Sequence, residues 1–208
     1  MLAHDVAELR RTPRAEQTMG MPIANERRWS VEDVWALPDD GQRYETVAGE
    51  LLVSPTPRFV HQRAVARIGV LLSAYVMAEG VGEVFWSPYD VVLEPFTLVQ
   101  PDVLVIPPVG QDVVRGEVPP PAPYLAIEVL SPSTARTDQL RKRPRYQEAG
   151  IECWLVDLES ELVERWTAEA ERPEVCGERL VWHPVGAASA FVLDVPRFMR
   201  EVLGSRAG

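Results

Sequence analysis

LAIEVLSPST, residues 125–134, places one carboxylate, Glu128, in an otherwise apolar run that is typical of a buried strand. An ionised glutamate is rarely fully buried without a partner, because the loss of its water is costly unless a cation or hydrogen-bond donors replace it. Two explanations are open. Either Glu128 forms a salt bridge with a structural partner, or it binds a metal ion, and the surrounding sequence must supply the other groups that each explanation requires.

Composition limits the classes of protein to consider. The 208-residue chain is 46% hydrophobic, which is enough for one substantial core. Its net charge of -10 argues against broad, non-specific binding to nucleic acid, so any phosphate contact would be local. Cys153 and Cys176 have neither zinc-ligand nor disulfide-framework spacing. Without a membrane-spanning apolar run or a signal-peptide pattern, we expect a cytoplasmic protein that makes no membrane contact.

The chain is expected to contain an arm and one domain. Residues 1–28 are polar and are expected to form an N-terminal arm or extension, whereas residues 29–208 are expected to form a single domain. Within that domain, SVED at 30–33 resembles a capping box that opens a short helix. Residues 43–54 predict a hairpin with its turn at Ala48-Gly49.

The remaining elements follow from periodicity and turn residues. Apolar residues recur at helical spacing from 59 to 79, and Gly80 follows as a C′ residue. The further expected elements are strands at about 83–93, 99–106 and 123–130, a Pro-rich loop at 113–123, a helix at 138–150, a hairpin at 152–167, a strand at 178–184 and a C-terminal helix from 196. This order predicts an α/β (α+β) fold with a central mixed β-sheet flanked by helices.

Asp102 and Glu128 form the candidate site. Asp102 begins the strand PDVLVI, and Glu128 lies in the next strand, so pairing of these strands would direct both carboxylates to one point. Two like charges ~4 Å apart repel by roughly 4 kcal/mol at an effective dielectric of ~20, so the pair must share a proton or bind a cation. Hard oxygen ligands with open coordination positions suit Mg²⁺ or Mn²⁺, which could orient a water and stabilise charge on a phosphoryl oxygen.

Lys142 lies in a locally basic segment after Glu128. The segment from 136 to 145 also contains Arg141 and Arg143 in a chain that is acidic overall, as expected for a metal-dependent enzyme that acts on a polyanion. The Lys142 ammonium could reach the carboxylates and stabilise charge on phosphorus or orient the attacking water. Alternatively, a structural salt bridge between Lys142 and Glu128 would explain the buried glutamate without a metal.

These segments together resemble a bacterial family of restriction-endonuclease-like proteins called Uma-two, in the PD-(D/E)XK nuclease superfamily. The resemblance covers about residues 30–190 and rests on RYETVAGELL, VQPDVLVI, LAIEVLSPST and DQLRKRPRYQEAGIECWLVD in that order. It implies a restriction-endonuclease-like fold and a divalent-metal phosphodiester hydrolase site. By this resemblance Asp102 matches the Asp of the PD motif and Glu128 the second acidic ligand. Lys142 matches the lysine of a DxxxK segment that begins here at Asp138.

The match has one departure and one addition. In the wider superfamily the lysine stands two residues after the second acid, where this chain has Leu130, so Lys142 would be a migrated substitute. Pro144 then requires the helix either to start near Arg143 or to kink. The resemblance also implies that the N-terminal part of the domain adds an acidic residue to the metal site. Glu45 is the candidate for this residue. The alternative is that Glu45 is a half-exposed charged residue of the hairpin with no role at the site.

Two hypotheses follow. In the first, the protein is a Mg²⁺- or Mn²⁺-dependent endonuclease that hydrolyses DNA, with Asp102, Glu128 and the Val129 carbonyl as metal ligands. The residues expected to contact nucleic acid are His61, Arg63, Arg141 and Arg143, and a homodimer would suit a two-strand cut. In the second, the domain is catalytically silent and serves as a nucleic-acid-binding or protein-interaction module.

Overall fold

The computed structural model describes residues 27–54, 56–132 and 134–204. The expected N-terminal arm therefore lies outside the described residues, apart from its last two positions. The helices are α1 (Val31–Trp35), α2 (Phe59–Glu79), α3 (Gln111–Val114), α4 (Ala135–Thr137), the π-helical segment η1 (Asp138–Lys142), α5 (Arg143–Glu148) and α6 (Val195–Leu203). The strands are β1 (Arg43–Val47), β2 (Glu50–Ser54), β3 (Glu83–Trp86), β4 (Val91–Glu94), β5 (Thr97–Val99), β6 (Val103–Ile106), β7 (Leu125–Val129), β8 (Glu152–Asp157), β9 (Leu162–Trp166), β10 (Glu174–Cys176), β11 (Arg179–Trp182) and β12 (Phe191–Asp194).

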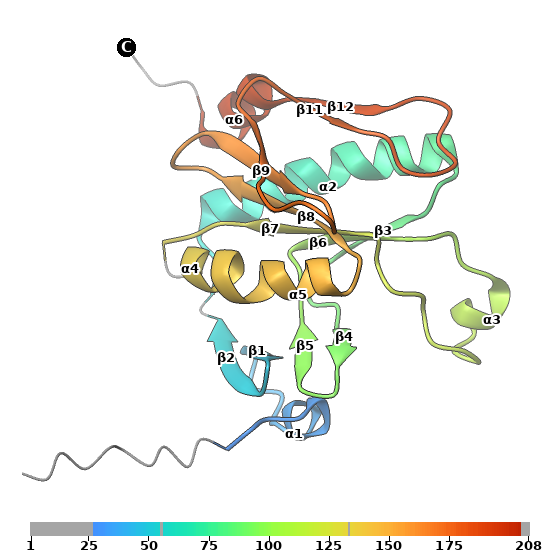
Figure 1. The fold of residues 1–208 in the computed structure, drawn as a ribbon, viewed down its shortest axis with the longest axis vertical. Helices are drawn as coiled ribbons and strands as arrows, with labels where there is room; N and C mark the ends of the chain where they lie inside the picture. The colour runs from blue at the N-terminus through green and yellow to red at the C-terminus, as the bar shows by residue number, and fades with distance from the viewer. Residues whose placement is uncertain (1–26, 55, 133, 205–208) are drawn as a thin grey trace, which may run out of the picture.

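A six-stranded sheet with the order β10-β9-β8-β7-β6-β3 lies at the centre of the fold. Its β7–β8 pair is parallel and its other pairs are antiparallel, so the sheet is mixed. Figure 1 shows α2 and α6 on one side of this sheet and α4–α5 on the other, with the smaller β2-β1-β5-β4 sheet beside them. The predicted α/β (α+β) arrangement, a mixed sheet flanked by helices, is confirmed.

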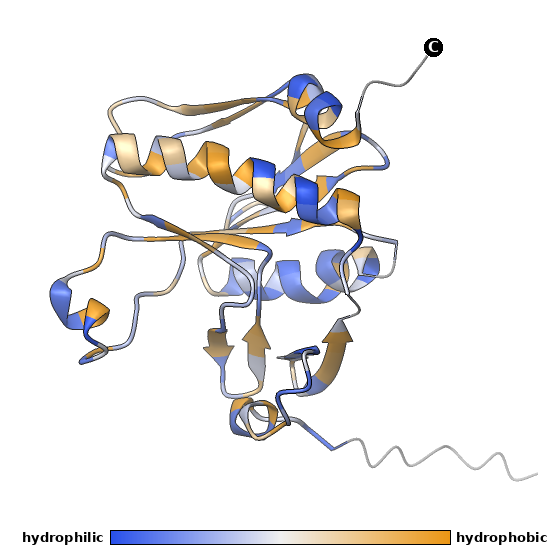
Figure 2. Ribbon diagram, turned by 180° about the vertical axis from the view of Figure 1, so that it is seen from behind, coloured by the Kyte–Doolittle hydropathy of each residue, from blue (hydrophilic) through white to orange (hydrophobic). Residues whose placement is uncertain are grey.

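The core occupies both faces of this sheet, because its central strands carry apolar side chains in both directions. All five residues of β7 are buried, as are the four of β6. Figure 2 shows largely hydrophobic strands between α2 and the α4–α5 helices. On its inner side α2 buries residues at helical spacing, among them Ala64, Ile68, Leu72 and Val76.

The N-terminal elements form as expected from local signals. Ser30 accepts a hydrogen bond from the backbone N–H of Asp33 at 3.1 Å, and the Asp33 carboxylate accepts one from the Ser30 N–H at 3.0 Å, which completes the capping box of α1. Strands β1 and β2 form the predicted hairpin, with Ala48 at φ 53° and Gly49 at φ 89° in its turn. Helix α2 ends at Gly80, whose φ of 66° places it in the left-handed region.

Two strands that the sequence predicts as continuous are each interrupted in the structure. The segment expected as one strand at 83–93 forms β3 in the large sheet and β4 in the small one, and the segment at 99–106 similarly separates into β5 and β6. Proline explains both breaks, because Pro88 and Pro101 lie at the interruptions and cannot donate to a strand ladder. The chain thereby crosses twice between the sheets, which brings the small sheet to the candidate site.

The segment after β7 is helical, as predicted, but it is not one uniform α-helix. Helix α4 leads into η1, and α5 begins at Arg143 with Pro144 in its first turn. The proline lacks an N–H and would clash with the preceding turn of a regular helix. The wider π-helical segment before it therefore accommodates Pro144, and π-helical turns are frequent at functional sites.

Three short elements were not foreseen: α3, β10 and β12. Helix α3 overlaps the start of the expected Pro-rich loop, because Val113 and Val114 precede the prolines. The hairpin of β8 and β9, the strand β11 and the C-terminal helix α6 are confirmed. Among the described helices, none is both long and apolar enough to cross a membrane.

Candidate active site

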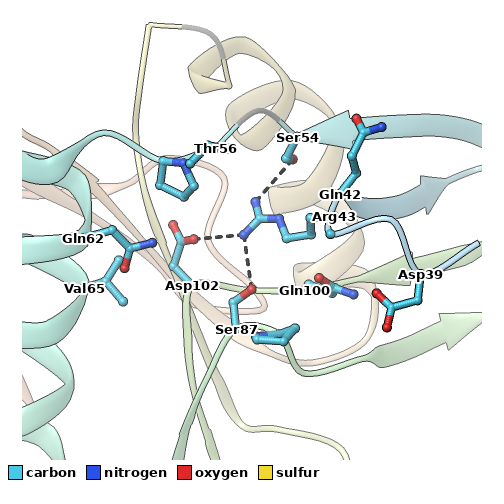
Figure 3. A pocket seen from close by; sticks show the side chains of 13 residues that line it. Asp39, Gln42, Arg43, Ser54, Thr56, Gln62, Val65, Ser87, Gln100 and Asp102 are labelled. Carbon is cyan, nitrogen blue, oxygen red and sulfur yellow. Dashed lines mark hydrogen bonds and ion pairs between the residues drawn. The ribbon is translucent and has the colours of Figure 1, made fainter.

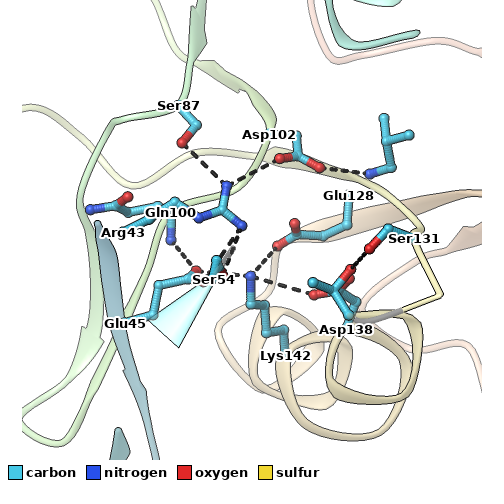
Figure 4. Close-up of polar contacts among 12 residues, drawn as sticks. Arg43, Glu45, Ser54, Ser87, Gln100, Asp102, Glu128, Ser131, Asp138 and Lys142 are labelled. Carbon is cyan, nitrogen blue, oxygen red and sulfur yellow. Dashed lines mark hydrogen bonds and ion pairs between the residues drawn. The ribbon is translucent and has the colours of Figure 1, made fainter. Parts of the chain in front are cut away.

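Four segments of the chain bring charged side chains to one place (Figure 4): β1, the residue before β6, β7 itself and η1. Strand β1 contributes Arg43 and Glu45, which lie two residues apart and so share one face of the strand. Asp102 precedes β6, which pairs with β7 in a register that puts Val103 opposite Ile127. Asp102 and Glu128 are therefore neighbours across the two strands, as the sequence predicted.

Lys142 lies at the centre of this cluster and is enclosed by three carboxylates. Its Nζ is 2.8 Å from Glu45 Oε1, 3.4 Å from Glu128 Oε1 and 3.4 Å from Asp138 Oδ1. Only 2% of the Lys142 side chain is exposed, and the three negative charges raise the pKa of its ammonium against the opposing effect of burial. Lys142 thus remains charged and neutralises part of the negative charge around it.

Glu128 is buried and has two partners. Besides Lys142, the Tyr146 hydroxyl donates a hydrogen bond of 2.7 Å to Glu128 Oε1. Burial raises the pKa of Glu128 well above its usual value, and the nearby carboxylates act in the same direction. The salt bridge that the sequence left open is therefore present, but it leaves an acid that still resists ionisation.

Asp102 is held differently, by donors that favour its charge. Its Oδ1 is 3.2 Å from Arg43 Nη1, and its Oδ2 accepts the Val129 N–H at 2.9 Å and lies 3.2 Å from His61 Nε2. Burial raises the pKa of Asp102, but hydrogen bonding and charge from His61 and Arg43 outweigh it, so the pKa is lowered overall. The cluster thus contains two neighbouring carboxyl groups whose pKa values are shifted in opposite directions, down for Asp102 and up for Glu128.

Glu45 is fully buried, so the alternative of a half-exposed hairpin charge is wrong. Its Oε1 accepts the backbone N–H of Gln100 at 2.7 Å in addition to the contact with Lys142. Its Oε2 accepts a hydrogen bond of 3.5 Å from the Ser54 hydroxyl and lies 3.7 Å from Arg43 Nη2. The small sheet therefore contributes the carboxylate of Glu45 and the guanidinium of Arg43 to the cluster, and the large sheet contributes Glu128.

The cluster contains more carboxyl groups than cationic side chains. Glu45, Asp102, Glu128 and Asp138 are buried beside Arg43 and Lys142, and His61 contacts Asp102. Burial also raises the pKa of Asp138. Such an excess of buried carboxylates is relieved either by protonation or by a cation that enters the site.

The donor set fits a hard divalent ion, although its ligands are not already assembled. In the described part of the chain, no three Asp, Glu, His or Cys side chains form a group that could hold a metal as they stand. However, Asp102, Glu128 and Asp138 line the same cavity of 480 Å³, and oxygen ligands in excess over cations are what Mg²⁺ or Mn²⁺ requires. The Val129 carbonyl, the third expected ligand, belongs to a residue whose N–H already contacts Asp102.

This cavity adjoins two others that share its lining. A cavity of 740 Å³ shares Arg43, Ser54 and Asp102 with it and extends along β1 past Gln42 (Figure 3). On the other side, a cavity of 310 Å³ shares Arg58 and His61 with it. The cavity that Asp102, Glu128 and Asp138 line therefore lies between two others, although these three side chains are themselves almost fully buried.

The residues expected to contact nucleic acid lie in different settings. His61 faces the cluster and lines the cavity, whereas Arg63 is exposed on α2. Arg141 forms an ion pair with Glu50, the first residue of β2 in the hairpin. Arg143 donates to Gln147 Oε1 at 2.5 Å, and its guanidinium lies 4.1 Å from the ring centroid of Trp166, so it is engaged in packing of the helix against the sheet.

Sequence analysis missed two groups of this cluster. Arg43 carries a readable signal, since it lies two residues before Glu45 in a predicted strand and so on the same face. Tyr146 has no such signal, because its contact with Glu128 depends on how α5 packs against β7. Asp138 was recognised only as the start of the DxxxK segment, and its burial follows from the turn of η1 that also brings in Lys142.

Comparisons with known proteins identify the family and the fold. The family described as "Uma2: Putative restriction endonuclease" matches residues 31–195. The fold is similar to the crystal structure of a putative nuclease belonging to DUF820 from Anabaena variabilis ATCC 29413, with a TM-score of 0.67 and 19% identity, over 84% of this chain and 99% of that chain. At this identity the similarity concerns the fold alone. No curated protein matches the chain.

Proposed function

This chain belongs to the Uma2 family, and from that premise we propose that it is a Mg²⁺- or Mn²⁺-dependent endonuclease that hydrolyses phosphodiester bonds of DNA. The observation that carries the proposal is the buried excess of carboxylates over cations along an open cavity. Purely structural clusters are more stable when their charges balance. An excess of acids at an accessible place is instead typical of a site that receives a cation.

Asp102 and Glu128 would hold the ion, together with the Val129 carbonyl. When bound, the ion would supply an activated water and stabilise charge on a phosphoryl oxygen. Asp102 is kept ionised by Arg43 and His61 and is ready to act as a ligand. A bound divalent ion would lower the raised pKa of Glu128, because a nearby positive charge favours the ionised carboxylate.

The other residues of the cluster hold these two acids in place. Lys142 and Tyr146 both contact Glu128 Oε1, so they fix the direction of its carboxylate. Lys142 also contacts Glu45 of the small sheet, which connects the hairpin to the helix after β7. Such support matters because a catalytic group that is displaced by about 1 Å loses much of its effect.

Cleavage assays with matched variants test this proposal. Plasmid and single-stranded DNA are incubated with Mg²⁺ and with Mn²⁺, using wild type, Asp102→Asn and Glu128→Gln. Exposed acids provide the controls Asp112→Asn and Glu117→Gln, which are prepared identically. We expect cleavage by wild type and both controls and at least about a 100-fold loss in both site variants, since each removes a ligand. Equal cleavage in all five proteins would contradict the proposal.

A second candidate is a catalytically silent module, and the contacts of Glu128 with Lys142 and Tyr146 favour it, because they give the acid partners without a metal. Thermal unfolding with and without divalent ions separates the two. A metal that binds only the folded state raises its stability once its concentration exceeds the dissociation constant. A silent module with an internal ion pair would show no dependence on Mg²⁺ or Mn²⁺.

Cleavage of both strands of a DNA duplex requires two cuts, which has a consequence for the oligomeric state of the protein. A homodimer would present one site to each strand of a duplex through two-fold symmetry. We therefore propose that the active species on duplex DNA is a dimer. The expected evidence is a cleavage rate that rises more steeply than linearly with protein concentration, in the range where light scattering detects dimer formation.

A further inference from the structure

The two cations of the cluster differ in their access to a substrate. Lys142 is 2% exposed, and it is absent from the lining of the cavities beside the cluster. Arg43 is 20% exposed and lines both the 480 Å³ and the 740 Å³ cavities. Figure 3 shows its guanidinium between Asp102, Ser54 and Ser87 at the wall of the cavity. A phosphate that enters the site would therefore meet Arg43 before it could reach Lys142.

The ammonium of Lys142 is also enclosed by its partners. Its Nζ has contacts with Glu45, Glu128 and Asp138, and an ammonium has three N–H donors. A phosphate oxygen could bind it only by displacing one of these carboxylates. Displacement would leave a buried carboxylate without its cation, which is strongly unfavourable.

The guanidinium of Arg43 makes only long contacts at the wall of the cavity. Its contacts are long: 3.2 Å to Asp102, 3.3 Å to Ser87, and 3.4 Å to Ser54, whereas charge-assisted hydrogen bonds are usually about 2.7–2.9 Å. Its Nε is buried and has no hydrogen-bond partner within the described part of the chain. The planar guanidinium matches the geometry of a phosphate group, which accepts two parallel N–H bonds, and its long contacts can be exchanged for phosphate oxygens.

Arg43 is also held in position by the fold. It lies opposite Ser54 in the β1–β2 register, and Glu45 on the same strand face lies 3.7 Å from its Nη2. These contacts keep the guanidinium beside Asp102 without enclosing it. A pre-positioned cation of this kind loses less conformational entropy on binding an anion than an exposed side chain does.

We infer that Arg43, and not Lys142, is the cation that contacts the phosphodiester of the substrate, and that Lys142 is a positioning residue for Glu45 and Glu128. The inference rests on the proposed nuclease function and deepens it. It assigns recognition of phosphate to the hairpin of the small sheet. It also explains why the chain tolerates Leu130 at the position where the wider superfamily has its lysine.

Single-turnover cleavage of DNA at increasing enzyme concentration tests this division of roles. The half-saturating concentration reports substrate binding and the maximal rate reports the chemical step. The variants are Arg43→Gln, the charge-preserving Arg43→Lys and Lys142→Arg. Arg179→Gln is the matched control, because Arg179 is exposed on β11, away from all the cavities described above.

We expect Arg43→Gln to raise the half-saturating concentration at least about tenfold, as the loss of a charged hydrogen bond predicts. It should also reduce the slope of log affinity against log salt by about 0.7–0.9, the value for one phosphate contact. Arg43→Lys should recover part of the binding. Lys142→Arg should lower the maximal rate and leave half-saturation within about twofold of wild type.

Three outcomes would overturn the inference. If wild type cleaves and Arg43→Gln binds as tightly as Arg179→Gln, Arg43 does not contact the phosphate. If Lys142→Arg weakens binding more than Arg43→Gln does, the roles are reversed. If wild type itself neither cleaves nor binds DNA with either metal, the proposed function fails and the inference fails with it. Should Arg43→Gln not fold, Arg43→Lys gives the same comparison, because a single ammonium cannot make two parallel bonds to phosphate.

Discussion

Strand β7 has two faces that are equally buried and chemically opposite. Leu125, Ile127 and Val129 point into the apolar cluster beneath α2 and α6. On the other face Ala126 joins the cluster that contains Tyr146 of α5, but Glu128 interrupts it. The first face needs only apolar side chains of suitable shape. The second requires charged side chains from four segments, and its four carboxyl groups outnumber the cations Arg43 and Lys142.

The two faces of β7 contribute differently to the stability of the fold. Burial of apolar side chains stabilises the α2 face without any specific partner. A buried charge cluster is weak evidence for stability, because desolvation offsets much of the attraction between its members. Under the proposed function, the cluster is a site that the apolar face of the same strand supports.

The largest expected difference concerns Lys142. Lys142→Met would leave Glu45, Glu128 and Asp138 buried without their shared cation. We expect the free energy of unfolding at pH 7 to fall by about 3–5 kcal/mol, the typical cost of breaking a buried charge pair. Urea titration monitored by tryptophan fluorescence measures this change. A fall below about 1 kcal/mol would mean that water reaches the cluster and screens it.

A substitution on the apolar face of β7 should lower the free energy of unfolding by less, and by an amount that does not depend on pH or metal. Ile127→Val removes one buried methylene and should lower the free energy of unfolding by about 0.5–1.5 kcal/mol. The same change is expected at pH 5 and pH 8 and with or without Mg²⁺, because no titrating group is involved. A pH-dependent or metal-dependent effect would show that the two faces of β7 are coupled.

The smallest change in stability, and the clearest pH dependence, is expected for Glu128→Gln. Because the folded state raises the pKa of Glu128, the folded protein binds a proton more tightly than the unfolded chain does. Wild type is therefore expected to lose stability as the pH rises above the ordinary glutamate value and through the raised pKa. Gln has no such titration, so the variant should gain relative to wild type as the pH rises.

Thermal unfolding of Glu128→Gln and wild type between pH 5 and pH 8, without divalent ions, measures this relative gain. At pH 7 we expect the two to differ by less than about 1 kcal/mol, since Gln retains the shape of Glu. Addition of Mg²⁺ or Mn²⁺ should stabilise wild type and have little effect on the variant. A large loss of stability in the variant without metal would instead support the silent module with a structural ion pair.

Local signals in the sequence predicted most of the elements. The capping box at Ser30, the turn at Ala48-Gly49, the C′ residue Gly80 and the apolar runs of β7 and β8 act within a few residues, so the correct elements could be read from them. The breaks at Pro88 and Pro101 were missed. Their prolines were visible, but whether the chain resumes in the same sheet depends on contacts with β1, far away in the sequence.

The candidate site divides in the same way. The sequence by itself indicated that Glu128 is buried, that it would neighbour Asp102 if their strands paired, and that a basic segment follows, because strand pattern and chain order can be read along the chain. Only the tertiary structure decided how the cations are used. It encloses Lys142 and leaves Arg43 open, since access to solvent depends on how the small sheet and η1 close over β7. The spacing of residues along one chain contains no information about that closure.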